Sequence, residues 1–302
     1  MQTLMFSYAA QHSSSVINDS DLRDLVNASN AKFLLVQEGR VSISGDPARL
    51  SLKTELELGS EPALLDNALF IVFFEGGPLF SVTLSEGIES GSVFETRRAE
   101  GRVGLFQTGM RLSPAEAQLA AKACHLSSWV QQNRYCSRCG SKMCIDQGTP
   151  KLRCIDAACG NEQFPRINPA VQVLVVFGER CLLARQSTFP PRFYSPITGF
   201  VDAAETAESA VRREVREELG LEVMETRYVT SQPWPFSSSL MLGYVALVNS
   251  DCGHLNESEL ESVVWLGRPE LAKAREASSI DSVLLQPVGL LGRSLVDAWS
   301  MT

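Results

Sequence analysis

Three glutamates in the second half of the chain have the spacing of a metal-binding group: Glu214, Glu217 and Glu218. Residues three and four positions apart lie on the same face of an α-helix, so these carboxylates should project together. Each pair of like charges at this spacing destabilises a helix by about 0.2–0.5 kcal/mol, and bound divalent cations would reverse the sign of that cost. The alternative is a solvated, charged helix face, which is what an isolated Glu-x-x-Glu-Glu usually forms.

The helix that should carry these glutamates has clear ends in the sequence. Thr206 can accept a hydrogen bond as the N-cap, and Gly220 can end the helix. Arg213 can reach Glu217 one turn later and help to orient it. The apolar stripe that should face the core consists of Ala207, Ala210, Val211 and Val215.

Four cysteines form a second group that could bind a metal. Cys136 and Cys139 make one close pair, and Cys154 and Cys159 make another. Two such pairs on either side of a short hairpin supply the four thiolates of a tetrahedral zinc site. Because cysteine fills all four positions, we expect one closed, structural Zn²⁺ per chain. Loose thiols or a redox pair are the alternative, and Cys144 is the replacement ligand if one of the four is misassigned.

A third segment could bind a flat organic group. Between Ser231 and Met241, two prolines flank Trp234, and an amide and several hydroxyls lie close by in the sequence. Proline stiffens the backbone, and an aromatic ring offers a flat apolar surface. The combination suits stacking on a base or nicotinamide ring with polar contacts to ribose. On its own, such a segment would more often be a rigid surface turn.

The composition limits the classes of function. The chain has 302 residues, a formal net charge of −8 and a hydrophobic fraction of 44%, as in soluble globular proteins. A broadly acidic protein disfavours tight nonspecific binding of nucleic acid. The apolar runs are far shorter than the ~20 residues of a membrane helix. Neither end resembles a secretory or peroxisomal signal, so we expect a cytoplasmic protein without a membrane partner.

An α+β fold must position these groups. Short apolar runs within Lys32–Thr83 alternate with turn signals and predict the strands of an N-terminal α/β domain, residues 1–111, which we interpret as a scaffold or dimerisation domain. Ser113 can cap a helix that connects this domain, over residues 112–132, to the four-cysteine segment at 133–165.

Residues 166–302 should form the domain that contains the glutamates. The run Val171–Phe177 predicts a buried strand, and Cys181–Arg185 predicts its hairpin partner. Further elements are expected as strands near Tyr228 and at Leu240–Val248 and as a last helix at Asp281–Trp299.

The glutamates lie within a longer pattern, Gly-x5-Glu-x7-Arg-Glu-Val-x-Glu-Glu-x-Gly-Leu, which begins at Gly199 and ends at Leu221. This pattern resembles the signature of the Nudix hydrolase superfamily. The resemblance implies an α/β/α sandwich with a mixed sheet, in which a loop, helix and loop hold Mg²⁺ or Mn²⁺ on a diphosphate. The metals would polarise phosphoryl oxygens and activate water. Glu214, Glu217 and Glu218 match the family's metal ligands; one of them, or a carboxylate outside the helix, would be the base.

The four-cysteine segment, Phe164-Pro165-Arg166 and the segment after Ser231 resemble the NADH pyrophosphatase subfamily, over about Leu112 to the C-terminus. Carried over by position, Glu259 and the backbone carbonyl of Thr198 would also bind metal. Phe164 and Phe200 would contact the nicotinamide, and Gly292 would contact substrate through its backbone. The dinucleotide site would be lined by Gln232, Pro233, Trp234, Pro235, Phe236, Ser237, Ser238 and Ser239.

The resemblance implies hydrolysis of the pyrophosphate bond of NADH or NAD⁺ to NMN(H) and AMP, by a protein that is commonly a homodimer. Removal of NAD caps from RNA is a possible second activity. The alternatives are a Nudix hydrolase that prefers ADP-ribose or diadenosine polyphosphate, and a zinc-ribbon binding module with an inactive Nudix domain. Three residues depart from the family pattern: Asp202 replaces glutamate, Ala204 replaces glycine and Ser237 replaces proline.

Overall fold

The computed structural model describes residues 24–37, 39–41, 43–45, 48–54, 68–84, 111–146, 150–276 and 283–301. The chain divides into two compact units, with the boundary between Arg166 and Ile167. We call them the N-terminal and C-terminal units and describe each by itself. The finer division of the N-terminal unit at residues 111 and 132 stays a prediction.

The N-terminal unit contains a mixed sheet in the order β2-β1-β7-β6, with β5 also paired to β1. β1 is parallel to β7, and β6 and β7 form an antiparallel hairpin. The strands are β1 (Lys32–Gln37), β2 (Arg40–Val41), β5 (Leu52–Lys53), β6 (Leu69–Phe74) and β7 (Gly77–Thr83), beside a separate pair, β3 (Ile43–Ser44) and β4 (Arg49–Leu50). These confirm the strands expected within Lys32–Thr83, as far as that range is described.

Helix α5 (Pro114–Gln132) follows, and its N-cap is Ser113, as the sequence predicts. The cysteine segment then forms a three-stranded antiparallel sheet in the order β10-β9-β8. Its strands are β8 (Met143–Asp146), β9 (Lys151–Cys154) and β10 (Glu162–Gln163). The short hairpin between the two cysteine pairs is therefore present, with residues 147–149 outside the described ranges.

The C-terminal unit is built on a six-stranded sheet in the order β14-β15-β11-β12-β16, with β13 paired to β11. The pair β11–β15 is parallel and the others are antiparallel, so the sheet is mixed. The strands are β11 (Asn168–Phe177), β12 (Arg180–Arg185), β13 (Ile197–Phe200), β14 (Val223–Trp234), β15 (Ser239–Val248) and β16 (Ser262–Gly267).

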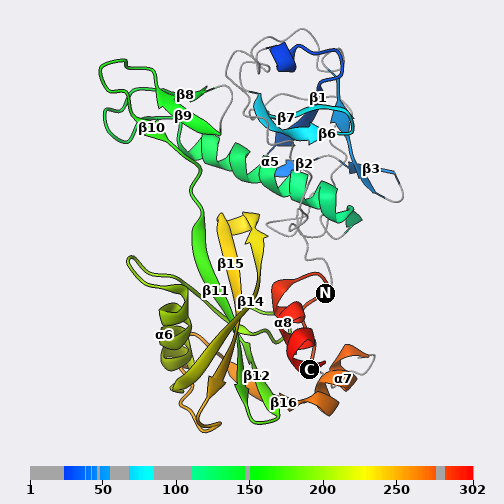
Figure 1. Ribbon diagram of the computed structural model, residues 1–302, viewed down its shortest axis with the longest axis vertical. Helices are drawn as coiled ribbons and strands as arrows, with labels where there is room; N and C mark the ends of the chain where they lie inside the picture. Colours follow the sequence, from blue (N-terminus) through cyan, green and yellow to red (C-terminus); the bar gives the residue numbers. More distant parts are fainter. Residues whose placement is uncertain are drawn as a thin grey trace. The chain divides into compact units, whose positions relative to one another are not determined.

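Helices cover both faces of this sheet (Figure 1). Helix α6 (Ala207–Leu219) lies on one face, and α7 (Arg268–Arg275) and α8 (Leu291–Ser300) lie on the other. The central strand shows why. Val171, Val173 and Val175 of β11 pack in the α6 core, whereas Leu174 and Val176 pack in the α8 core. A strand buried on both faces has a continuous apolar sequence. The expected α/β/α sandwich is confirmed.

Two expected elements differ in the structure. The segment after Ser231 separates the strands expected near Tyr228 and at Leu240–Val248, but β14 continues through it to Trp234 because its backbone pairs with the start of β15. Pro233 is tolerated there because β14 is an edge strand, where a missing N–H breaks no ladder. The last helix begins at Leu291 rather than Asp281, after Pro287 and a turn with Gly289 at a φ of 92°. Residues 281 and 282 lie outside the described ranges.

Candidate active site

Helix α6 presents its glutamates in two environments. The hydroxyl of its N-cap, Thr206, accepts a hydrogen bond from the backbone N–H of Ser209 at 3.1 Å, and Gly220 ends the helix in the left-handed conformation. The apolar stripe packs on the sheet. Glu214 and Glu218 are buried at the edge of that contact, whereas the side chain of Glu217 is 53% exposed.

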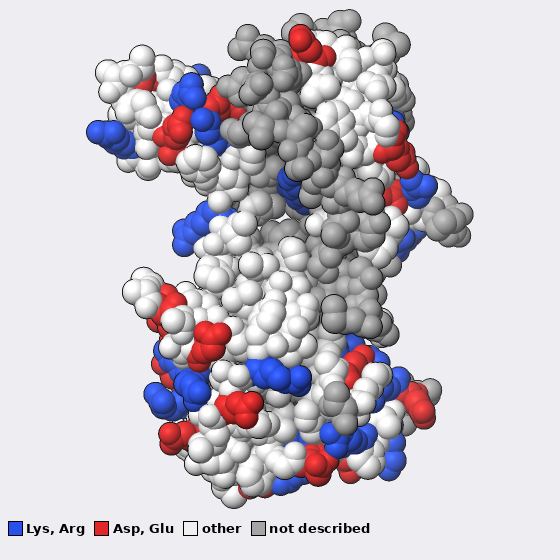
Figure 2. All heavy atoms as spheres, in the orientation of Figure 1, with Lys and Arg blue, Asp and Glu red and all other residues white. Residues whose placement is uncertain are grey.

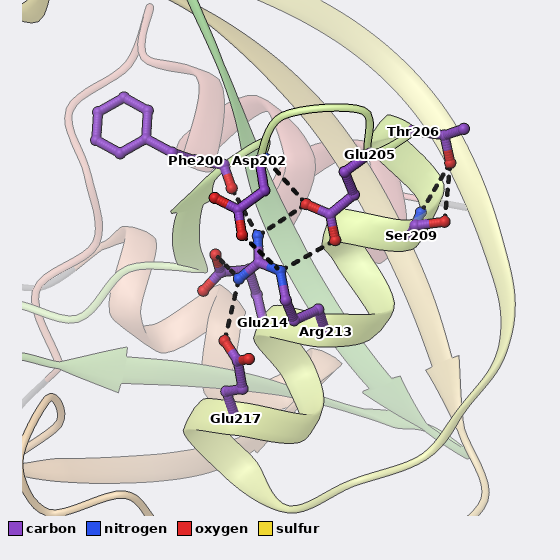
Figure 3. Close-up of polar contacts among 8 residues, drawn as sticks. All are labelled: Phe200, Asp202, Glu205, Thr206, Ser209, Arg213, Glu214 and Glu217. Carbon is purple, nitrogen blue, oxygen red and sulfur yellow. Dashed lines mark hydrogen bonds and ion pairs between the residues drawn. The ribbon is translucent and has the colours of Figure 1, made fainter.

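Arg213 gathers the acidic side chains of the loop and helix (Figure 3). Its Nε and Nη2 atoms each donate to the Glu205 carboxylate at 3.0 Å, a two-point contact. Its Nη1 donates to Glu214 at 2.7 Å and to Glu217 at 3.0 Å. Its Nη2 also donates to the backbone carbonyl of Phe200 at 2.7 Å. One guanidinium thus ties the strand end, the loop and one turn of α6 together, and the pKa of Arg213 is raised, first by Glu205.

Gly199 explains how Glu214 can approach the sheet so closely. A Cβ atom at position 199 would overlap the carboxyl group of Glu214. Only glycine leaves that space open. The position of Glu214 therefore explains why the Nudix pattern begins with glycine. Phe200, the next residue of β13, points to the other face of the sheet, and its ring points away from the Arg213 contacts in Figure 3.

Glu218 is the most unusual carboxyl group of the site. It is 3% exposed, and its Oε2 atom is buried without a hydrogen-bond partner. Burial, and next the carboxylates of Glu214 and Glu259, raise the pKa of Glu218 to about 8. Burial also raises the pKa of Glu214. A buried, unpaired carboxylate beside like charges is costly unless a cation compensates it, so these residues fit a divalent cation.

Glu259 reaches this cluster from a different element. The loop before β16 is fastened to the end of α6 by two backbone hydrogen bonds, from His254 to Leu219 and from Asn256 to Glu218. The Asn256 side chain then donates to the Glu259 carboxylate at 3.1 Å. The charge of Glu259 contributes to the raised pKa of both buried glutamates.

The two departures in the loop before α6 have visible consequences. Ala204 has a φ of 64°, a conformation that L-residues other than glycine rarely adopt. The replacement of glycine by Ala204 therefore places backbone strain in this loop. Asp202 is 3.9 Å from Arg213 and 75% exposed, so its shorter side chain makes a weak ion pair. Its backbone N–H instead donates to Glu205 at 3.0 Å.

The tip of the β14–β15 hairpin contains the aromatic segment. Pro235–Ser237 form one 3-10 turn, and the Trp234 and Phe236 rings meet edge to face with centroids 4.8 Å apart. Asn168 of β11 donates to the carbonyl groups of Ser237 and Ser238 and thereby fixes the tip. The hydroxyls of Ser237 and Ser239 lie 2.9 Å apart.

The hairpin tip and Phe200 lie at the same end of the sheet. Ala170 of β11 pairs with Phe200 on one side and with Met241, near the tip, on the other. Adjacent strands are about 4.8 Å apart, so the backbones at Phe200 and Met241 are about 10 Å apart, with β11 between them. Phe200 is 56% exposed, which leaves its ring available to a ligand.

Two predicted substrate residues make their contacts inside the protein. Gln232 is 1% exposed; its amide donates to the carbonyl of Gly289 at 2.9 Å and accepts from the N–H of Leu291 at 2.8 Å. A Cβ atom at Gly292 would overlap the side chain of Gln286. Direct contact of Gln232 or Gly292 with a substrate stays a prediction.

The cysteine cluster lies in the N-terminal unit. The Sγ atoms of Cys136, Cys139, Cys154 and Cys159 all lie within 4.8 Å of one another, as ligands of one metal ion require. Among the residues that the structure describes, no other group of cysteine, histidine or acidic side chains converges in this way. Cys144 is exposed, and its Sγ donates to the carbonyl of Arg153, so it stands apart from the cluster.

The comparison with protein families agrees with this geometry. The family described as NUDIX domain matches residues 166–286. The C-terminal part of the chain is therefore a Nudix domain. The NADH pyrophosphatase zinc ribbon domain matches residues 131–164, which include the four clustered cysteines.

Named relatives are similar to about two thirds of this chain. The NAD-capped RNA hydrolase NudC of Pseudomonas aeruginosa is 42% identical over 193 residues, which cover 64% of this chain and 66% of that protein. The NAD-capped RNA hydrolase NUDT12 of Homo sapiens is 33% identical over 198 residues, covering 63% of this chain and 43% of that protein. The chain thus spans less than half of the human relative. A crystal structure of a NUDIX hydrolase from Nitrosomonas europaea has a TM-score of 0.39 and 20% identity, over 50% of this chain and 84% of that one.

The Nudix domain brings together only part of the predicted site. The charges of Glu214 and Glu259 both raise the pKa of Glu218. Arg213 donates hydrogen bonds to both Glu214 and Glu217 and so connects Glu217 to this group. Thr198 adjoins Gly199 on β13. Phe164 is 65% exposed and belongs to the N-terminal unit, so its contact with the nicotinamide stays a prediction.

Three contributors to the site were not assigned from the sequence. Glu205 and Gly199 lie inside the Nudix pattern, so a signal was present, but their partners follow from the folded loop. Asn256, which holds Glu259, lies outside every motif and could be found only from the structure.

Proposed function

We propose that the protein hydrolyses the pyrophosphate bond of NADH or NAD⁺, producing NMN(H) and AMP, with Mg²⁺ or Mn²⁺ held by the glutamate cluster. The observation that carries this proposal is the buried, unpartnered oxygen of Glu218 among like charges. The ligands would be Glu214, Glu217, Glu218, Glu259 and the backbone carbonyl of Thr198. Bound there, a divalent cation would neutralise phosphoryl oxygens and lower the pKa of a water molecule.

The protein's own residues have separate roles in this proposal. Arg213 holds Glu214 and Glu217 in fixed orientations. A carboxylate of the cluster accepts the proton of the attacking water. On the visible face of the C-terminal unit, basic and acidic side chains lie intermixed (Figure 2). In this proposal, the cations held by the glutamate cluster attract the pyrophosphate.

The dinucleotide would bind at the end of the sheet that carries Phe200 and the hairpin tip. The exposed ring of Phe200 and the paired rings of Trp234 and Phe236 offer flat surfaces for a base and a nicotinamide. The hydroxyls of the tip can bind ribose. Because the amide of Gln232 is engaged with the start of α8, we propose that Gln232 also supports the hairpin.

A second proposed activity is the removal of NAD caps from RNA. The support is that human and bacterial relatives are named NAD-capped RNA hydrolases. An RNA with a 5′ NAD should lose its NMN group in the presence of metal, whereas the same RNA with a 5′ triphosphate should not. Equal action on both RNAs would count against this activity.

We further propose that the cysteine cluster holds one structural Zn²⁺. The zinc ribbon match and the convergence of four thiols support this choice of metal. A homodimer and a cytoplasmic location stay predictions. No described helix is long and apolar enough to cross a membrane.

A substrate panel tests the proposal against its alternatives. NADH, NAD⁺, ADP-ribose and a diadenosine polyphosphate are compared by kcat/KM with and without added Mg²⁺ or Mn²⁺. The proposal expects the highest value for NADH or NAD⁺ and no turnover without metal. A higher value for ADP-ribose or the diadenosine compound would change the substrate. Absence of turnover with all four would favour a binding module with an inactive Nudix domain.

A further inference from the structure

A buried polar cluster lies on the α8 side of the sheet, outside the glutamate site. We call Gln172, Ser195 and Gln286 the anchor cluster. The Ser195 hydroxyl accepts hydrogen bonds from the amide of Gln172 at 3.3 Å and from that of Gln286 at 2.9 Å. It donates to the carbonyl of Pro196 at 2.9 Å. Gln172 is 5% exposed and Ser195 is 4% exposed.

The hydroxyl at the centre of the anchor cluster has three partners. A hydroxyl group has one donor and two acceptor positions, and the Ser195 hydroxyl uses all three. Gln172 and Ser195 are buried and Gln286 is half-buried, so loss of a partner of Gln172 or Ser195 would leave a buried polar group unpaired, which is more costly than the bond itself is stabilising. The cluster therefore fixes the backbone at Ser195 and Pro196 rather than merely filling space.

That backbone leads directly into β13. Thr198, the predicted carbonyl ligand, and Gly199, whose missing side chain admits Glu214, follow within four residues of Ser195. Gln172 lies directly opposite Thr198 in the β11–β13 pair. A shift of Ser195 would consequently move both the carbonyl of Thr198 and the space that Glu214 occupies.

Gln286 is supplied by the segment that precedes α8. A Cβ atom at Gly292 would overlap the Gln286 side chain and approach Pro196 to 2.9 Å, so a larger residue at this position would have to displace the Gln286 amide. On the other side, Gln232 of β14 binds Gly289 and Leu291. The segment from Gln286 to Gly292 is thus held by Gln232 of β14. Through Gln286 it in turn holds Ser195, which precedes β13.

We propose that Gln286 is a positioning residue for β13, acting through Ser195, and that Gly292 serves by leaving room for it. This proposal rests on the proposed metal-dependent function. It gives Gln232 and Gly292, which the resemblance assigns to the substrate, a structural role: both help to place the segment that supports β13. The segment before α8 links the hairpin tip to the metal ligands.

Two variants test the proposal, Gln286→Met and Ser195→Ala. Mn²⁺ binding is measured by calorimetry on zinc-loaded protein without substrate, beside kcat and KM for NADH. Loss of a residue that orients metal ligands typically weakens metal binding or activity about 10- to 100-fold. Both variants should therefore bind Mn²⁺ at least about tenfold more weakly, with a matching fall in kcat and a smaller change in KM.

Ser300→Ala is the matched control. Its hydroxyl also has three partners, Arg275, Val296 and Asp297, but at the far end of α8. It should leave Mn²⁺ binding and kcat unchanged. Circular dichroism first shows that Gln286→Met is folded. The proposal is overturned if this variant binds Mn²⁺ with an affinity within about twofold of the wild type, or if Ser300→Ala loses as much Mn²⁺ affinity as Gln286→Met. Because Mn²⁺ binding needs no substrate, a wild type that fails to hydrolyse NADH would refute the function and leave this test intact.

Discussion

Among the described residues of the Nudix domain, only Glu218 has a buried side-chain oxygen without a hydrogen-bond partner. Its unpartnered oxygen and its pKa of about 8 are costly features in a protein without metal. Side chains that are costly to the fold and close to other charges cluster at functional sites. The spacing of the three glutamates predicted that they share a face. It could not predict which of them would be buried, since that depends on the sheet and on the Glu259 loop.

The cost of Glu218 should be measurable as a pH-dependent loss of stability. A glutamate in the unfolded chain ionises near its ordinary pKa of 4.5, whereas folded Glu218 retains its proton up to about pH 8. The folded state therefore loses stability, relative to the unfolded state, as the pH rises from 4.5 to about 8. Without added Mg²⁺ or Mn²⁺, Glu218→Gln should unfold at a higher denaturant concentration than the wild type at pH 8.

The difference between Glu218→Gln and the wild type should shrink as the pH falls toward 4.5. The exposed Glu222 lies beyond the end of α6, so Glu222→Gln is the control and should follow the wild type at every pH. A stability difference that stays constant with pH would mean that Glu218 is ionised in the folded, metal-free protein.

At the scale of elements, periodicity predicted α6, α5 and the β11–β12 hairpin well. Each has a strong apolar pattern, and the two helices also have capping residues, so the sequence near each element determines it. The β14–β15 hairpin was harder, because two prolines indicate a loop while the backbone pairing that extends β14 is made with a strand farther along the chain. The late start of α8 likewise reflects the contacts of Gln232 and Gln286, which are distant in sequence.

The loop before α6 carries strain at Ala204 that a single substitution should relieve. A left-handed conformation costs an L-residue about 1–2 kcal/mol, and the greater freedom of glycine in the unfolded chain offsets part of that. Ala204→Gly should stabilise the protein by about 0.5–1 kcal/mol in chemical denaturation.

Ala203→Gly is the neighbouring control. Ala203 is not among the residues with positive φ, so glycine there relieves no strain and should be neutral or destabilising. If the two substitutions changed stability equally, the strain at Ala204 would not be real.

For the whole molecule, the sequence identified two chemical sites, and the structure assigns them to different units. The glutamates lie in the Nudix domain, and the cysteines lie in the zinc ribbon. The cysteine spacing alone predicted the convergence of four thiols, because the ligands of a closed metal site are local in sequence. The role of Phe164 needs both units at once and could not be derived from either.

Substitution of one clustered cysteine should separate the two sites functionally. Cys136→Ser should lose most of the bound zinc, measured by atomic absorption, because a four-thiolate site has no spare ligand. Its N-terminal unit should become more sensitive to protease, while the Nudix domain keeps its ability to bind Mn²⁺. Cys144→Ser, an exposed thiol outside the cluster, should retain zinc. Zinc loss in Cys144→Ser but not in Cys136→Ser would exchange the two assignments.

The central claim is that the Glu218 cluster holds the metal that cleaves a dinucleotide pyrophosphate. Its most direct test is the release of AMP from NADH by the wild type, Glu218→Gln and Glu222→Gln, with Mn²⁺ present and again after its removal. We expect AMP from the wild type and Glu222→Gln only when Mn²⁺ is present, and none from Glu218→Gln although it remains folded. AMP release by Glu218→Gln at the wild-type rate, or by the wild type without a divalent cation, would contradict the claim.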